Sequence, residues 1–199
     1  MNRRTLFLKK LTTGLFRNES REMTGRSRGV RTRETLERIL REAEEVVWVL
    51  DFTGTGSIDF SWADEVVAKM VSRLWSNEYG EKFLVLKSLS PSQTENIGVA
   101  LERKKLAVLT IGPSGWQVVG SLNNYLVHTL HQVMKKRQLT LRELSEEEGI
   151  GMNTSGTRLL NLYKKRLVSR VEGIPRMNRE ASHRGRQYIY ESLLSVSRC

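Results

Sequence analysis

Apolar residues across positions 32–119 follow two alternating patterns, a helical period and short β-branched runs. The helical period appears three times and predicts amphipathic helices, the first over 32–45 with Thr32 as its cap. Three short runs predict strands, at 46–52, 82–86 and 106–111. The first run is apolar enough for a strand buried on both faces, and Trp116–Val119 is expected to pair with the third strand. The alternation predicts an α/β fold, a small mixed sheet with helices.

The helix predicted between the first two strands places its apolar residues inward, at Ala63, Val66, Val67, Met70, Val71 and Leu74. Residues 1–29 differ from this pattern because they have few apolar positions and much Arg, Ser, Gly and Asn. We therefore expect a basic, weakly ordered leader over 1–29, followed by the α/β domain over 30–119. Gly120 marks the expected start of a second domain over 120–199.

The segment 120–199 begins with two predicted helices. The first runs over 122–137, has apolar residues on one face, and can be capped by Ser121. The second starts at a capping box, because Thr140 and Glu143 are three residues apart and can satisfy each other's free amides. Gly149 is expected to end that second helix.

A third helix starts near Asn153 and is followed by a basic hairpin. The helix buries Leu159, Leu162 and Leu167, and its leading end carries polar residues that can contact DNA: Asn153, Thr154, Ser155, Thr157 and Arg158. The hairpin tip is rich in basic residues, namely Arg176, Arg179, His183, Arg184 and Arg186, and QYIYESL returns as an alternating strand. This order of helices and hairpin is the ground plan of a winged helix-turn-helix.

The net charge of +11 is distributed unevenly. Residues 1–45 carry 12 basic and 7 acidic groups, residues 46–120 carry 7 and 8, and residues 121–199 carry 14 and 7. Basic segments on both sides of a near-neutral middle favour a polyanionic partner, and general solubility is the alternative explanation.

Several classes of function find no support in the sequence. No apolar run approaches the roughly 18 residues that cross a membrane, and Lys9 and Lys10 interrupt any secretory signal. The single cysteine, Cys199, is compatible with a reducing cytoplasm. His128 and His131 lack a third ligand, and no catalytic set stands out, so we expect no metal, no cofactor and no enzyme.

The stretch VVWVLDFTGTGSIDFSWADEVVAKMV resembles STAS-like domains, relatives of the anti-sigma-factor antagonists, and the resemblance spans about residues 25–110. It implies a module that binds a partner or a signal. In the antagonists a partner kinase phosphorylates a serine at the start of the helix after this loop, and Ser61 is the matching position. Phe60 and Trp62 depart from the small residues usual there. The simpler alternative is that Ser61 or Asp59 only caps the helix.

The stretch TRLLNLYKKRLVSR resembles MarR-like winged-helix regulators, and this resemblance covers about residues 121–194. It implies that the third helix is the recognition helix. The arginines at the hairpin tip can reach phosphates or enter a minor groove. We expect base contacts from the polar leading end, with Arg158 at their centre. We expect phosphate contacts from Lys164, Lys165, Arg184 and Arg186. Arg166 departs from the family pattern, which usually has Gly or Asn there.

The sequence thus predicts a cytoplasmic DNA-binding transcriptional regulator with a STAS-like sensory or partner-binding domain. Its partner is double-stranded DNA, and a homodimer stays open because nothing locates an interface. The alternative is a partner-switch protein that binds a kinase or anti-sigma-type ATPase, with the winged helix as a protein-interaction surface.

Overall fold

The computed structural model describes residues 1–16, 23–173 and 187–194. The chain forms two compact units, Met1–Leu122 and Asn123–Cys199, which divide close to the boundary expected at Gly120. Within the described residues, no helix is long and apolar enough to cross a membrane.

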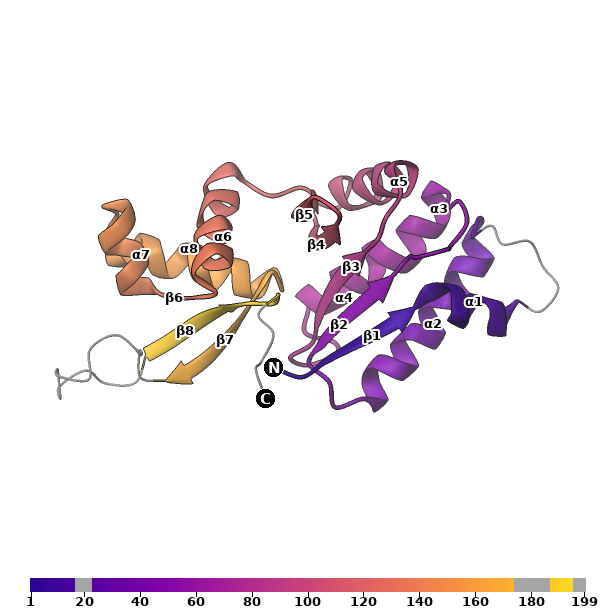
Figure 1. Ribbon diagram of the computed structural model, residues 1–199, viewed down its shortest axis with the longest axis horizontal. Helices are drawn as coiled ribbons and strands as arrows, with labels where there is room; N and C mark the ends of the chain where they lie inside the picture. Colours follow the sequence, from indigo (N-terminus) through magenta and orange to yellow (C-terminus); the bar gives the residue numbers. More distant parts are fainter. Residues whose placement is uncertain (17–22, 174–186, 195–199) are drawn as a thin grey trace. The chain divides into compact units, whose positions relative to one another are not determined.

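The first unit is an α/β structure built on a five-stranded sheet (Figure 1). The strands lie in the order β1-β2-β3-β4-β5: Arg3–Phe7, Val47–Asp51, Phe83–Lys87, Ala107–Gly112 and Gly115–Gly120. The first four are parallel and β5 is antiparallel to β4, so the predicted mixed sheet is confirmed. Every residue of β2 is buried, as its apolar run predicted.

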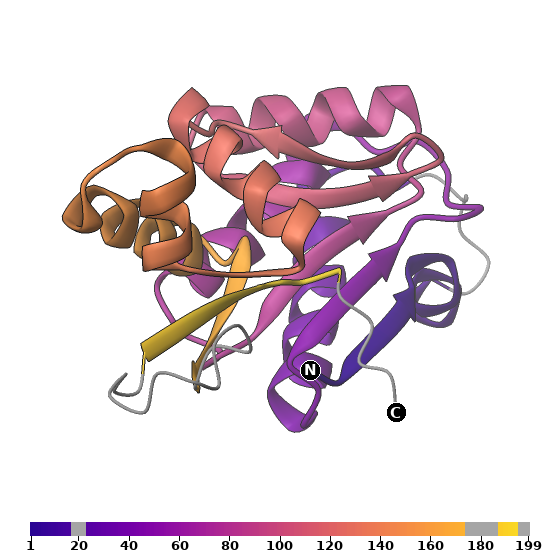
Figure 2. The ribbon, with the colours of Figure 1, turned by 60° about the vertical axis from the view of Figure 1, so that its left-hand side comes forward.

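The helices of this unit pack together as one layer on the sheet (Figures 1 and 2). They are α1 (Leu8–Leu15), α2 (Arg26–Glu42), α3 (Phe60–Ala63), the π-helical segment η1 (Asp64–Ala68), α4 (Lys69–Trp75) and α5 (Pro91–Glu102). The segments α3, η1 and α4 follow one another without a break. Trp48 and Leu50 of β2 join the apolar core under these helices, together with all six inward positions predicted for 63–74.

The described part of the leader expected over 1–29 is more ordered than its composition predicts. Arg3–Phe7 forms β1, which pairs in parallel with β2 and lies at the edge of the sheet. An edge strand with one neighbour needs little apolar surface, and only Leu6 packs against the core. Arg4 supplies further contacts, since its guanidinium lies 5.4 Å from the Trp48 ring centroid and 3.7 Å from Glu45 Oε2. Sequence reasoning therefore underestimated a strand held by backbone pairing.

The first long helix also begins earlier than expected. Thr32 was predicted to cap it, but α2 starts at Arg26, and Thr32 is buried inside the helix with its hydroxyl donating to Arg28 O at 2.9 Å. The N-cap is Gly25, and its amide donates to the carboxylate of Asp59 at 2.8 Å. The start of α2 is thus fixed by a contact to a residue 34 positions away in the chain.

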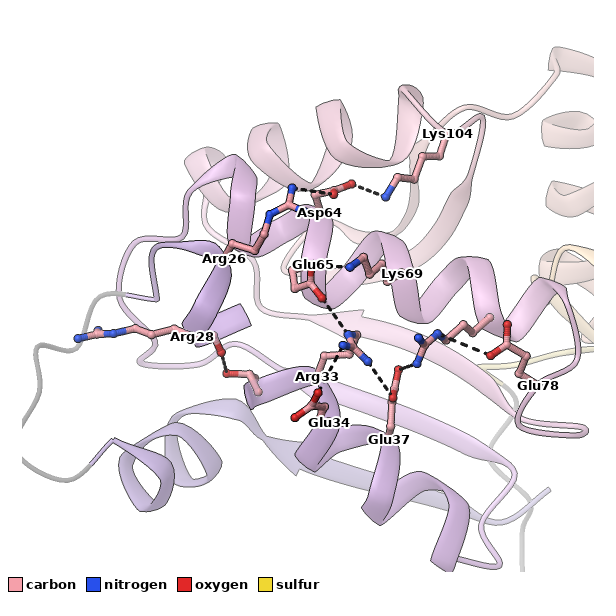
Figure 3. A network of polar contacts seen from close by, with 12 residues as sticks. Arg26, Arg28, Arg33, Glu34, Glu37, Asp64, Glu65, Lys69, Glu78 and Lys104 are labelled. Carbon is pink, nitrogen blue, oxygen red and sulfur yellow. Dashed lines mark hydrogen bonds and ion pairs between the residues drawn. The ribbon is translucent and has the colours of Figure 1, made fainter. Parts of the chain in front are cut away.

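Gly29 lets α2 approach η1 closely, because a Cβ at Gly29 would lie 2.8 Å from the Cβ of Glu65. The side chains of this contact form a buried ionic network, seen in Figure 3. Arg33 Nε donates to Glu65 at 3.2 Å, and Arg33 Nη1 donates to Glu37 at 3.0 Å. Both carboxylates have further partners, since Lys69 donates to Glu65 at 2.6 Å and Arg73 donates to Glu37 at 2.5 Å.

The acids in this network are held in their charged form. Burial by itself raises the pKa of Glu37, but hydrogen bonds from Tyr79 and Arg33 outweigh it, and the net pKa is lowered. The pKa of Glu65 is also lowered, since donors on Lys69 and Arg33 outweigh its burial. Burial and the Glu37 carboxylate raise the pKa of Tyr79, which keeps its hydroxyl as a donor. The helices α2, η1 and α4 are therefore joined by full charges inside the layer.

The described residues of the second unit form three helices and a three-stranded antiparallel sheet (Figure 1). Its elements are α6 (Asn124–Lys136), β6 (Gln138–Thr140), α7 (Leu141–Glu148), α8 (Met152–Lys164), β7 (Val168–Gly173) and β8 (Gln187–Ser192). The strand order is β6-β8-β7. The predicted burial of Leu159, Leu162 and Leu167 is confirmed.

The helix ends of this unit agree in part with the prediction. The capping box of Thr140 and Glu143 is present, and Gly149 ends α7 in the left-handed conformation. Ser121 does not cap α6, because the helix starts later and Asn123 is its N-cap residue. Arg166 has a positive φ of 58°, so this non-glycine residue adopts the left-handed turn conformation that Gly or Asn takes more readily.

Replacing the central arginine of the buried network tests its contribution to stability. We expect Arg33→Ala to lower the free energy of unfolding by about 3 kcal/mol, because Glu37 and Glu65 would each lose a buried partner. The matched control is Arg26→Ala on the same helix, because the Arg26 side chain is exposed and its long ion pair to Asp64, at 3.9 Å, is worth less than about 1 kcal/mol. Chemical denaturation measures both values, and equal small losses would contradict the importance of the network.

Candidate nucleic-acid interface

Helix α8 presents a polar face to solvent. Asn153, Thr154, Thr157 and Lys164 are exposed, whereas Leu159 and Leu162 are fully buried on the opposite side. Spacings of four and seven residues place Asn153, Thr157 and Lys164 on one stripe of the helix. We call these four exposed residues the α8 polar face. They are short hydrogen-bonding groups followed by a cation, all predicted from the sequence.

The hydroxyls of the predicted contact residues differ in availability. Ser155 is fully buried, and its hydroxyl donates to Gly151 O at 3.3 Å, so it does not belong to the exposed face. The periodicity explains this, because Ser155 is four residues before the buried Leu159. Thr157 donates its hydroxyl proton to Asn153 O at 2.8 Å. The residue is exposed, and its hydroxyl oxygen keeps acceptor capacity, which suits an amino group of a DNA base.

Arg158, the predicted centre of base recognition, is already engaged in an ion pair. Its Nη1 donates to Glu148 Oε2 at 2.9 Å, and its side chain is 22% exposed. Its guanidinium also lies 5.5 Å from the Tyr125 ring centroid. The structure thus brings Arg158 to the edge of the α8 polar face but holds it toward α6 and α7.

The predicted phosphate contacts are placed unequally. Lys164 is exposed at the end of α8, whereas burial lowers the pKa of the half-buried Lys165. Arg184 and Arg186 lie outside the described residues, as do Arg176, Arg179 and His183. Of the two expected phosphate contacts that lie within the described residues, Lys164 therefore has the clearer access to a polyanion.

An aromatic–arginine stack beside α8 escaped sequence reasoning. The guanidinium of Arg170, on β7, lies 4.3 Å from the ring centroid of Tyr163 and 4.0 Å from that of Tyr188. The register of β7 and β8 brings Tyr188 close to Arg170. Glu172 is opposite Tyr188, and Arg170, two residues before Glu172, shares its face of the strand. The stack connects the end of α8 to the hairpin, so both elements keep a fixed relation. The only signal in the sequence was the alternation of tyrosines in QYIYESL.

The acidic residues before α8 do not all face the same way. Glu146 and Glu147 are exposed, and Glu147 forms an ion pair with Lys136 of α6. Glu148 points instead to Arg158 of α8. Glu147 and Glu148 are thus engaged with cations of the same unit, which reduces the repulsion that a bare acidic cluster would exert on a polyanion.

The first unit carries the second predicted site, Ser61. Asp59 caps α3, since its carboxylate accepts from Trp62 N at 2.7 Å, and the expected capping alternative is confirmed for Asp59. Ser61 is half-buried in the first turn. Cations lie nearby, because Arg103 stacks 4.5 Å from the Phe60 ring centroid, and Lys104 pairs with Asp64 (Figure 3).

An open cleft of about 390 Å³ lies in the first unit between the loop after β2 and the start of α5. Hydroxyl groups and glycines line it, including Thr55, Ser57, Ser88 and Ser90. The amide of Gln93 fixes the loop by donating to Thr55 Oγ1 at 3.0 Å and Gly56 O at 2.8 Å. The cleft is therefore polar and preformed, which suits a small polar molecule better than an apolar one.

The chain matches no protein-family model and no curated protein. Among the described residues, no group of three His, Cys, Asp or Glu side chains is arranged to hold a metal ion. The function is therefore inferred from the geometry of the chain itself.

Proposed function

We propose that the protein is a DNA-binding transcriptional regulator whose second unit acts as a winged helix. The α8 polar face carries this proposal, because it combines exposed hydrogen-bonding side chains with a terminal lysine on a helix followed by a hairpin. The element order α6, β6, α7, α8, β7, β8 and the strand order β6-β8-β7 support it. The net charge of the segment that includes this unit has the sign that a polyanion requires.

In this proposal α8 lies in the major groove of double-stranded DNA. Asn153 is suited to adenine, whose N6 and N7 match the donor and acceptor of an amide side chain. Thr157 offers an acceptor and a methyl group, and Lys164 neutralises a phosphate. Arg170 does not reach for DNA but fixes the hairpin to α8 through its stack on Tyr163 and Tyr188.

We assign the first unit the role of a STAS-like module that receives a signal or a partner. The preformed polar cleft supports a small-molecule signal. The position of Ser61 supports a second candidate function, a partner switch. A phosphate in the first turn of a helix is favoured by free backbone amides and the dipole, and Arg103 and Lys104 lie beside this turn.

Variants of the α8 polar face separate sequence reading from phosphate binding. On a genomic fragment selected by the wild-type protein, Asn153→Ala is expected to cost about 1–3 kcal/mol and to leave a scrambled fragment unaffected. Lys164→Ala is expected to weaken both fragments alike and to lower the salt slope by about one. Fluorescence anisotropy at several salt concentrations measures these effects. Lys104→Ala in the first unit is the charge-matched control, and losses equal to those of Lys164→Ala would contradict the assigned interface.

Phosphorylation of Ser61 is tested by the intact mass of protein isolated from its host. The partner-switch function predicts a fraction heavier by one phosphate under some growth conditions, and Ser61→Ala is expected to abolish that fraction. A single unmodified mass under every condition would count against this second function without affecting DNA binding.

A further inference from the structure

Glu148 connects the three helices of the second unit through one carboxylate. Its Oε2 accepts from Arg158 of α8 at 2.9 Å, and its Oε1 lies 3.6 Å from Nδ1 of His128 on α6. The Glu148 side chain is 10% exposed. Its buried Oε1 has no hydrogen-bond partner among the described residues. The carboxylate is therefore satisfied on one side only, and the group nearest the other side is an imidazole.

A buried carboxylate oxygen without a donor is unfavourable. The protonated imidazole of His128 carries an N–H at Nδ1 whichever tautomer the neutral ring adopts, and it adds a positive charge beside the carboxylate. His128 is suitably placed for proton exchange, since its side chain is 56% exposed while Nδ1 faces Glu148. Histidine is the side chain whose charge commonly changes between about pH 5 and 8. When His128 is neutral, Glu148 has one cationic partner, Arg158. When His128 is protonated, Glu148 has two.

We propose that Glu148 is a clasp shared by Arg158 and His128, in which proton uptake by His128 loosens Arg158 and makes it available to DNA. The inference rests on the proposed function and names a regulation of the same site. With His128 neutral, Glu148 and Arg158 form a neutral pair. With His128 charged, two cations share one negative charge, and the more exposed phosphates of DNA compete better for Arg158.

Thermodynamic linkage determines whether protonation of His128 raises or lowers the affinity for DNA. When Arg158 moves to DNA, Glu148 is left with His128 alone, and this bare carboxylate favours the protonated imidazole. DNA binding therefore raises proton affinity at His128, and by reciprocity protons raise DNA affinity. DNA binding is therefore expected to strengthen as the pH falls from about 8 to about 5.5.

The groups that face Glu148 come from the two neighbouring helices. His128 and Tyr125 belong to α6, and Arg158 belongs to α8, with its guanidinium between Glu148 and the Tyr125 ring. On α7 itself, Glu147 is engaged with Lys136. His131, also exposed on α6, and Glu147 therefore provide matched controls for His128 and Glu148.

The clasp is tested first without DNA, by nuclear magnetic resonance of the full chain with labelled histidine and arginine. We expect the Arg158 side-chain resonances to shift with the same midpoint as the His128 ring. In Glu148→Gln or His128→Asn, the Arg158 shift is expected to disappear, while His131→Asn retains it. If the Arg158 resonances of the wild-type protein do not change with pH together with those of the His128 ring, the clasp is overturned, independently of any DNA-binding result.

The consequence for DNA is tested by affinity for a selected genomic fragment at about pH 8 and about pH 5.5. We expect wild-type affinity to rise about tenfold on acidification. His128→Asn keeps the weaker affinity at both pH values, and His131→Asn keeps the rise. Glu148→Gln binds about tenfold more tightly already at the higher pH, whereas Glu147→Gln changes affinity less than about twofold.

The outcomes separate the clasp from the proposed function. Coupled resonances without DNA binding by any variant would support the clasp and contradict the DNA-binding function. Equal gains for Glu147→Gln and Glu148→Gln would overturn the proposed regulation, because general charge would then explain both. Circular dichroism of each variant confirms that the helices are retained.

Discussion

A buried carboxylate is stable only when a cation or a hydrogen-bond donor lies beside it, and this requirement determines which helix faces pack together in both units. In the first unit Glu37 and Glu65 receive Arg33, Arg73 and Lys69, which joins α2 to η1 and α4. In the second unit Glu148 receives Arg158 and faces His128. Glu37 and Glu65 each accept hydrogen bonds from at least two side chains. Oε1 of Glu148, by contrast, has no hydrogen-bond partner within the part of the chain that the structure describes, so it can accept a new donor.

This difference decides which residues of α8 are available for recognition. The α8 polar face consists of side chains that the core and the ion pairs leave exposed, and Lys164 is its cation. Arg158 belongs to the same helix but is held by Glu148, so under the proposed function its contribution to DNA binding would depend on the state of its neighbours. A count of charges alone would treat Lys164 and Arg158 as equivalent. The geometry distinguishes them, because Lys164 is exposed and Arg158 is paired with Glu148.

The sequence predicted the elements that have a periodic apolar signal or a local cap. The inward residues of 63–74, the buried leucines of α8 and the Thr140–Glu143 capping box all follow from local spacing. The features that it did not predict are held by distant partners. β1 depends on β2, the start of α2 depends on Asp59, and Arg158 depends on Glu148, and none of these pairings has a local signature. Ser155 was misplaced because its polarity outweighed its helical phase.

The most direct test of the account is retention of genomic DNA fragments by the purified full-length protein at several salt concentrations, followed by sequencing of the retained fragments. The account predicts enrichment of one sequence motif and an affinity that falls steeply with salt. Retention without any enriched motif, lost at about physiological salt, would contradict a sequence-reading role for α8.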